Sequence, residues 1–251
     1  ELFHAQDGLL DTHLAALLPQ RAGMADLYFI GFAPHGTQDV FGKELQRVSR
    51  LMRERFDAVG RSLLLSNDPV TLRDLPIASA TNLRATLERV GEVMDAEEDI
   101  LFLYVTTHGS EDGELSVELP PLELSQIRPA ALARMLHESG IKWKVVVISA
   151  CYSGGFIEPL RDDNTLVITA TDARNQSFGC DNGEDLTWFG RAYFDQALRR
   201  TRSFAEAFEL ARAAVAQRER EQKLPASNPQ MYLGVAIKDR LQGLEARLKA
   251  E

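Results

Sequence analysis

Short apolar runs alternate with amphipathic segments along most of the chain. Six runs have the length and composition of β-strands and lie at 26–33, 61–67, 99–107, 143–150, 165–171 and 231–237. Among the remaining segments, apolar residues recur at helical spacing in 39–57, 81–94, 129–139, 187–199 and 203–222. The run at 99–107 is almost continuously apolar, so we expect it to be covered on both faces. Thr81 is the expected N-cap of the helix at 81–94.

This alternation of strands and helices predicts an α/β fold. Right-handed crossovers between successive strands give a mostly parallel central sheet of about six strands, with helices on both faces. Ligands bind such sheets at the carboxyl ends of the strands. A further helix is predicted at 7–18. We therefore divide the chain into an N-terminal helical extension, 1–22, and a single domain, 23–251.

Composition and charge narrow the functional classes. The chain of 251 residues is 45% hydrophobic and 26% charged, which is ordinary for a globular protein. Its net charge of -9 comes with basic residues scattered along the helices, so we expect no nucleic-acid partner. No apolar run has the roughly 20 residues that a membrane helix needs. The chain starts at Glu1 rather than Met, which indicates a fragment or a processed form.

Two reactive side chains follow apolar strands directly. His108 follows the third predicted strand and Cys151 follows the fourth, 43 residues later (151 minus 108). If these strands are neighbours, both side chains emerge at the same edge of the sheet. An imidazole next to a thiol, together with nearby backbone N–H groups, is the arrangement that activates a cysteine nucleophile.

The residues around this pair are small. Attack of a thiolate on an amide creates an oxyanion, which needs hydrogen-bond donors about 3 Å away. The N–H groups of Gly109 and Cys151 are candidates for these donors, and the glycines in 153–155 allow a sharp turn after the cysteine. Taken singly, a cysteine at a strand end is more often a small buried apolar residue, and a His-Gly pair is more often a turn.

The two motifs resemble those of a known family. "LFLYVTTHGSEDG" at 101–113 and "VVVISACYSGG" at 145–155 are similar to the His-Gly and Ala-Cys signatures of caspase-fold cysteine peptidases of clan CD. The resemblance is strongest to the legumain-like peptidases, family C13, in their bacterial branch. It continues through "TLVITATDARNQSFGCDNGEDLTWFGRAYFDQAL" at 165–198 and covers roughly residues 26–237. It implies a caspase-like three-layer sandwich.

The resemblance implies a cysteine endopeptidase with a Cys-His dyad. Cys151 would be the nucleophile and form a thioester acyl-enzyme, and His108 would protonate the leaving amine and later assist the water. Gly109 and Cys151 would supply the oxyanion hole. The substrate is then a peptide or protein in an extended conformation. The alternatives are a transpeptidase or ligase with the same dyad, and a non-catalytic caspase-fold binding module.

The resemblance also assigns a substrate pocket, in which this sequence departs from the family. Legumains, which prefer asparagine before the scissile bond, have an Arg-His pair, a Glu and an Asp where this chain has Pro34-His35, Ser149 and Arg191. With two pocket carboxylates replaced, Arg191 could pair with an acidic side chain as well as with a neutral amide, so the specificity, asparagine or acidic, is open. The structural alternatives are that His35 is a turn residue and that Arg191 is a solvated helix residue.

The remaining predictions are more general. Ser177 and Phe178 are placed on a groove-edge strand where an extended peptide could pair, with ordinary strand packing as the alternative. Cys180 is interpreted as a structural thiol. We predict no metal and no cofactor, because no converging set of ligands is visible. Bacterial relatives often carry a membrane anchor ahead of the peptidase domain, so an anchored or periplasmic protein is compatible with the resemblance, and the oligomeric state is open.

Overall fold

A central sheet of six strands organises the chain in the computed structural model, which describes residues 6–250. The strands are β1 (Leu27–Ala33), β2 (Ser62–Ser66), β3 (Ile100–Thr106), β4 (Trp143–Ser149), β5 (Thr165–Thr169) and β6 (Gln230–Leu233). Their spatial order is β2-β1-β3-β4-β5-β6, with β1 to β5 parallel and β6 antiparallel to β5. The mostly parallel α/β sheet predicted from the sequence is therefore confirmed.

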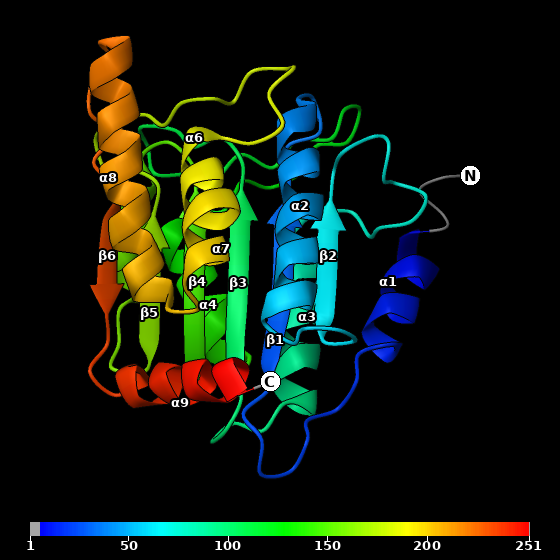
Figure 1. Cartoon of the computed structure of the whole chain (residues 1–251). Coiled ribbons are helices and arrows are strands. Elements are labelled where there is room, and N and C mark those ends of the chain that lie inside the picture. Colours follow the sequence, from blue (N-terminus) through cyan, green and yellow to red (C-terminus); the bar gives the residue numbers. More distant parts are fainter. Residues whose placement is uncertain (1–5, 251) are drawn as a thin grey trace.

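Helices cover both faces of this sheet (Figure 1). The longer ones are α1 (Gln6–Ala15), α2 (Asp39–Arg55), α3 (Ala80–Val93), α4 (Pro129–Glu138), α8 (Phe204–Gln222) and α9 (Ile237–Ala250). The shorter ones are η2 (Ser153–Phe156), α5 (Ile157–Leu160), α6 (Trp188–Gly190), η3 (Arg191–Ala197) and α7 (Leu198–Arg200), and η3 is a π-helical stretch that joins α6 to α7. The result is a three-layer sandwich.

The two faces of the sheet hold separate apolar cores. On one face, α2, α8, α9 and the segment from α6 to α7 pack over side chains such as Phe29, Phe102 and Val147. On the other, α3, α4 and α5 pack over Leu103, Val146 and their neighbours. Every residue of β3 and β4 is buried, as the continuous apolar runs predict.

The ends of two predicted elements differ from expectation. The helix at 81–94 is α3 and begins at Ala80, and its N-cap is Ser79, not Thr81. The Ser79 hydroxyl accepts a hydrogen bond from the Asn82 N–H at 3.1 Å, which satisfies one of the free donors of the first turn. The last strand, β6, is shorter than the predicted 231–237, because the chain turns into α9 at Ile237.

The predicted N-terminal extension contains one helix, α1, which ends at Ala15 rather than at the predicted residue 18, and residues 16–22 are not helical. Residues 1–5 of the predicted extension, 1–22, lie outside the described part. Helix α1 packs on the α3 side of the molecule, where Leu10, Leu14 and Leu17 contact the apolar core of that face. The extension and the domain thus share apolar contacts. No helix in the range 6–250 combines the length and the hydropathy required to cross a bilayer.

Candidate active site

His108 and Cys151 lie at the same edge of the sheet. Strands β3 and β4 are parallel neighbours, and their register pairs Thr106 with Ser149 at the carboxyl ends. The pairing continues one step further, where the Thr107 N–H donates to the Ser149 carbonyl at 3.2 Å. His108 and Cys151 follow from there, and both are half-buried. The condition on which the sequence prediction depended, that these strands are neighbours, is met.

Gly109 brings the two segments into direct backbone contact. A Cβ atom placed on Gly109 would lie 1.9 Å from the carbonyl oxygen of Cys151 and 3.0 Å from its carbonyl carbon. No real side chain tolerates such a distance, so only glycine allows the chain after β3 to approach this closely. The Gly109 N–H faces the Cys151 thiol closely enough to lower the pKa of the thiol.

The turn after Cys151 is made by Tyr152 rather than by the following glycines. Tyr152 has φ 56° and ψ 15°, in the left-handed region that an aromatic residue rarely adopts. The surroundings hold it there: its N–H donates to Asn175 O at 2.9 Å, and its hydroxyl donates to Glu111 Oε1 at 3.1 Å and accepts from Gln176 Nε2 at 3.0 Å. Unusual backbone conformations held by such contacts concentrate at functional sites.

Backbone donors surround the Cys151 thiol. The Ser177 N–H donates to Sγ at 3.2 Å. Burial raises the pKa of the Cys151 thiol, and hydrogen bonds from the N–H groups of Ser177, Cys151 itself and Gly109 partly offset that rise. The thiol is therefore protonated at neutral pH, in a site whose donors favour the thiolate once it forms.

The His108 imidazole is held from three sides. Its ring lies edge-on to His35, with ring centroids 4.7 Å apart, and edge-on to Phe41, with centroids 5.0 Å apart. Its Nε2 is hydrogen-bonded to the Oε1 of Gln38. Because a carbonyl oxygen only accepts, this bond places the ring proton on Nε2 and leaves Nδ1 free as a base. Burial lowers the pKa of His108, and the neighbouring His35 lowers it further.

His35 is buried beside His108, which sequence reasoning did not foresee. Only 7% of His35 is exposed, and its Nδ1 lies 3.0 Å from Ser116 Oγ and 3.5 Å from Glu118 Oε2. Its Nε2 contacts Thr37 Oγ1 at 2.8 Å. The alternative reading as a turn residue that caps the next helix does not apply, because Gln38 is the N-cap of α2. His35 is thus a neighbour of the imidazole.

Ser149 belongs to a buried hydrogen-bonded group centred on Glu44. The Ser149 hydroxyl lies 3.2 Å from Thr187 Oγ1, and the N–H and hydroxyl of Thr187 donate to Glu44 Oε2 at 2.6 and 2.9 Å. Thr106 donates to Oε1 at 2.8 Å, and Tyr104 donates to the same oxygen. Burial raises the pKa of the Glu44 carboxyl, whereas these four donors favour its ionised form.

Sequence reasoning missed Glu44, although the pattern held a signal. Within the amphipathic helix 39–57, Glu44 stands between Phe41 and Leu45 on the apolar face, where a charged residue is out of place. Side chains of its type are almost never fully buried unless they are paired or hydrogen-bonded, so a charge in that position indicates a specific set of partners.

The segment with Ser177 and Phe178 lies beside Cys151 but is not a strand. Residues 175–180 have no regular secondary structure, which corrects the predicted groove-edge strand. Backbone groups of this segment bond to other elements instead: Asn175 O accepts from Tyr152, and Phe178 O accepts from the Trp188 N–H at 3.0 Å. The Phe178 ring packs against Trp188, with centroids 5.3 Å apart.

Arg191 makes its contacts with residues other than Ser149 and Glu44. Its Nη2 pairs with Glu184 Oε2 at 3.4 Å, and a third of its side chain is exposed. Arg191 lines a hollow between η3 and α8 together with Trp188 and Arg218. The preceding residue, Gly190, touches Glu44 closely, since a Cβ there would lie 2.0 Å from Oε2. The structure thus joins Ser149 to Glu44 and gives Arg191 other neighbours.

Both cysteines are free thiols, and both are half-buried. Cys180 packs against the apolar core that also contains Phe189 and Phe194. Burial raises the pKa of the Cys180 thiol far above its ordinary value. Among residues 6–250, no group of three or more His, Cys, Asp or Glu side chains is arranged to hold a metal ion.

Comparison with known proteins connects this geometry with a family. The model of the peptidase C13 family matches residues 81–238, a span that includes both His108 and Cys151. The chain belongs to the peptidase C13 family. No curated protein shows significant sequence similarity to it. The match indicates a cysteine peptidase and confirms the legumain-like resemblance, while His35, Gln38 and Glu44 lie before the matched span.

The fold of this C13 family member is that of the caspases. The crystal structure of caspase-1 from Spodoptera frugiperda superposes with a TM-score of 0.58, at 16% sequence identity. The superposition covers 87% of this chain and 93% of the caspase chain. The predicted caspase-like three-layer fold is thus confirmed.

Proposed function

We propose that this protein is a cysteine endopeptidase in which Cys151 is the nucleophile and His108 is the general base and acid. The observation that carries the proposal is the shared edge of β3 and β4, where the backbone of Gly109 lies against that of Cys151. This contact joins the histidine segment to the cysteine segment, and the Ser177 N–H donates to the sulfur from a third segment. Membership of the C13 family supports the same assignment.

The reaction begins from a neutral pair. Burial raises the pKa of Cys151 and lowers that of His108, so thiol and imidazole are both uncharged at rest. When a peptide binds, the thiol proton moves to Nδ1 of His108 and the sulfur forms a bond to the scissile carbonyl carbon. The N–H groups of Gly109 and Cys151 donate to the oxyanion that develops on the carbonyl oxygen.

Collapse of this tetrahedral intermediate completes acylation. The carbon–nitrogen bond breaks, the imidazolium of His108 gives its proton to the leaving amine, and a thioester to Cys151 remains. Water then attacks the thioester carbon and loses a proton to His108. The carbon–sulfur bond breaks, the thiolate of Cys151 takes the proton back from His108, and the carboxylic acid product leaves.

We propose a neutral amide, such as asparagine, as the side chain before the scissile bond. The Ser149 hydroxyl can accept from a carboxamide N–H or, on rotation, donate to its oxygen, whereas the Thr187 hydroxyl gives its proton to Glu44. Glu44, the acceptor for Thr187 behind this hydroxyl, is an acid whose pKa burial raises, so it offers an acidic side chain no cationic partner. The alternative, an acidic side chain paired with Arg191, has less support because Arg191 pairs with Glu184.

A positional peptide library tests both parts of this proposal. We expect cleavage of peptides with asparagine at the varied position to exceed cleavage of the matched aspartate peptides, and Cys151→Ala to abolish cleavage of every peptide. Cys180→Ala is the matched control and should retain activity. If the Cys151→Ala protein still cleaves, the dyad assignment is wrong. Product masses in the presence of an added amine distinguish hydrolysis from transpeptidation.

A further inference from the structure

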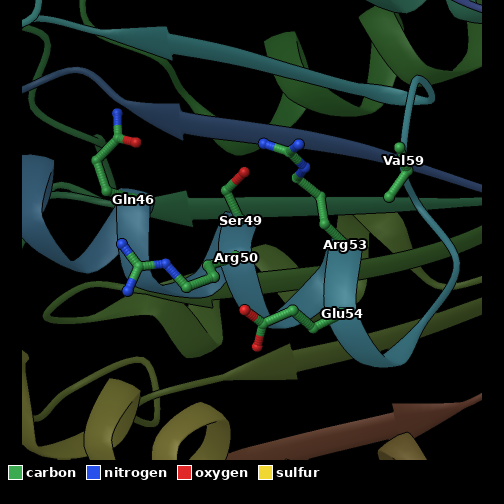
Figure 2. A pocket seen from close by; sticks show the side chains of 6 residues that line it. All are labelled: Gln46, Ser49, Arg50, Arg53, Glu54 and Val59. Carbon is green, nitrogen blue, oxygen red and sulfur yellow. The ribbon is translucent and has the colours of Figure 1, made fainter.

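Helix α2 borders a hollow at the end that is remote from the candidate active site. The hollow has a volume of about 390 Å³ and is lined by Gln46, Ser49, Arg50, Arg53, Glu54 and Val59 (Figure 2). Gln38, which contacts His108, caps the opposite end of α2. Eleven residues separate Gln38 from Ser49 (49 minus 38), or about 16 Å along a helix axis. The hollow is therefore a separate feature of the molecule.

Within the described residues, Ser49 presents an unpartnered hydroxyl to this hollow. The residue is 6% exposed and lines the hollow, yet its hydroxyl makes no hydrogen bond to any residue in the described range 6–250. A serine inside a helix either bonds the carbonyl one turn earlier or points outward, and the Ser49 hydroxyl, which makes no such bond, opens to the hollow. The Ser49 hydroxyl is thus free to donate to a group that enters the hollow.

Two arginines without ion-pair partners flank this hydroxyl. Arg50 and Arg53 are exposed, and within residues 6–250 neither has a carboxylate at ion-pair distance. Acids outnumber bases 37 to 28 in the chain, so a shortage of carboxylates does not explain the two free guanidinium groups. Figure 2 shows the Arg53 guanidinium beside the Ser49 hydroxyl, on the same side of α2 as the Gln46 amide.

The spacing of these residues places them on one face of the helix, although Figure 2 shows the Arg50 guanidinium directed away from the Ser49 hydroxyl. Positions 46, 49, 50 and 53 follow the three- and four-residue spacing of neighbours on a helix surface. Arg47 adds positive charge toward the start of α2, whereas Lys43 pairs with Asp39 at 2.8 Å. Glu54 also borders the hollow, but Figure 2 shows its carboxylate directed to the opposite side of the helix from the Ser49 hydroxyl.

We propose that this hollow binds a phosphate group. Arginine presents paired N–H donors that match phosphate oxygens, and the Arg53 guanidinium and the Ser49 hydroxyl lie side by side in the hollow. Arg50 supplies a second positive charge to a dianionic phosphate. A carboxylate has only two oxygens to satisfy this set, whereas a phosphate ester has three free oxygens. The phosphate could belong to a soluble phosphoester or to a lipid headgroup, since both present the same group.

Titration calorimetry with inorganic phosphate tests the site. We expect saturable binding to the wild-type chain and a loss of about tenfold in affinity for Ser49→Ala and for Arg53→Gln, each of which removes one donor. Arg134→Gln is the matched control, because Arg134 is an exposed arginine of α4, on the other face of the sheet, and also has no ion pair within the described residues. Glu54→Gln should bind phosphate more tightly, since it removes a like charge.

Two further arms identify the source of the phosphate. Glycerol 3-phosphate represents soluble esters, and phosphatidylcholine vesicles with and without phosphatidic acid represent a lipid surface. If glycerol 3-phosphate or the vesicles bind more tightly than inorganic phosphate, and Arg53→Gln loses this tighter binding, that compound class is the source of the phosphate. The proposal is overturned if inorganic phosphate does not bind at millimolar concentration, or if the Arg50→Gln/Arg53→Gln double variant, shown to be folded by its circular dichroism, binds it as well as the wild type.

Discussion

Gly109 and Cys151 lie backbone to backbone at the shared edge of β3 and β4, too close for any side chain on Gly109. Gly109→Ala should therefore displace the turn that carries the thiol and its N–H donors. We expect kcat/KM to fall by about 100-fold, the usual effect of losing an oxyanion donor. Gly155→Ala is the control, since a Cβ there meets nothing within 4 Å, and it should stay within about twofold of wild type.

The hydrogen bond from His108 to Gln38 sets the tautomer of the imidazole. Gln38→Ala removes the acceptor for the Nε2 proton, so we expect the Nδ1–H form to gain population and kcat to fall by about 100-fold. Gln38→Glu keeps an acceptor and should retain the Nε2–H tautomer while raising the pKa of His108. Nitrogen NMR of the His108 ring reads the tautomer directly. An unchanged tautomer in Gln38→Ala would contradict this role.

The pH profile should follow the lowered pKa of His108. The acidic limb of kcat/KM is expected below pH ~6.5, the ordinary histidine value, because burial and His35 both disfavour the imidazolium. His35→Gln removes a like charge, so the limb should move to higher pH. Asp181→Asn removes an acid that raises the pKa of His108, so the limb should move to lower pH. Shifts in the same direction for both variants would refute the electrostatic explanation.

The two thiols should differ in reactivity. Burial raises the pKa of both thiols, but hydrogen bonds from Ser177 and Gly109 offset part of the rise at Cys151, whereas the pKa of Cys180 in the apolar core is raised further. Iodoacetamide should therefore alkylate Cys151 first, and the rate should rise with pH as the thiolate forms. Peptide mass spectrometry over a time course identifies the site. Earlier alkylation of Cys180 would show that the relative exposure or acidity of the thiols is misassigned.

The buried Glu44 carboxylate should be a stability determinant. Glu44→Leu leaves the N–H of Thr187 and the hydroxyls of Tyr104 and Thr106 without their acceptor, so we expect the free energy of unfolding to fall by about 3 kcal/mol. Glu44→Gln should cost less, because the amide oxygen can still accept from the Thr187 N–H while the hydroxyls rotate.

Urea unfolding measures the free energy of unfolding of the wild type and of both Glu44 variants, and so ranks the two effects. Glu88→Gln is the control: Glu88 is exposed on α3 and should change the free energy of unfolding by no more than about 0.5 kcal/mol. If Glu44→Leu were as stable as wild type, the four hydrogen bonds to Glu44 would not contribute to stability.

The chemistry at the edge of the sheet could be predicted because it depends on order along the chain. An apolar run that ends in His108-Gly109 and another that ends in Ala150-Cys151 are readable without coordinates, and parallel pairing brings their ends together. The residues at which individual elements begin and end were harder to predict from the sequence. Ser79 replaced Thr81 as the N-cap of α3, since several small polar residues compete there and backbone geometry selects one.

The partners of the dyad could not be predicted. Gln38 and Glu44 come from α2, and they reach His108 and Ser149 only through the packing of that helix across the sheet. Tyr152 adopts its left-handed conformation because Asn175, Glu111 and Gln176 hold it, and nothing in the local sequence indicates this.

The sequence by itself determined the strand order along the chain, the α/β class and the placement of Cys151 and His108 at strand ends, because periodicity and local composition encode these features. Only the tertiary structure decided which groups surround that pair: His35 edge-on to the imidazole, Glu44 behind Ser149, and Arg191 in another hollow. The physical reason is that side-chain partners depend on how distant elements pack, and each of these contacts joins elements that are separated in sequence.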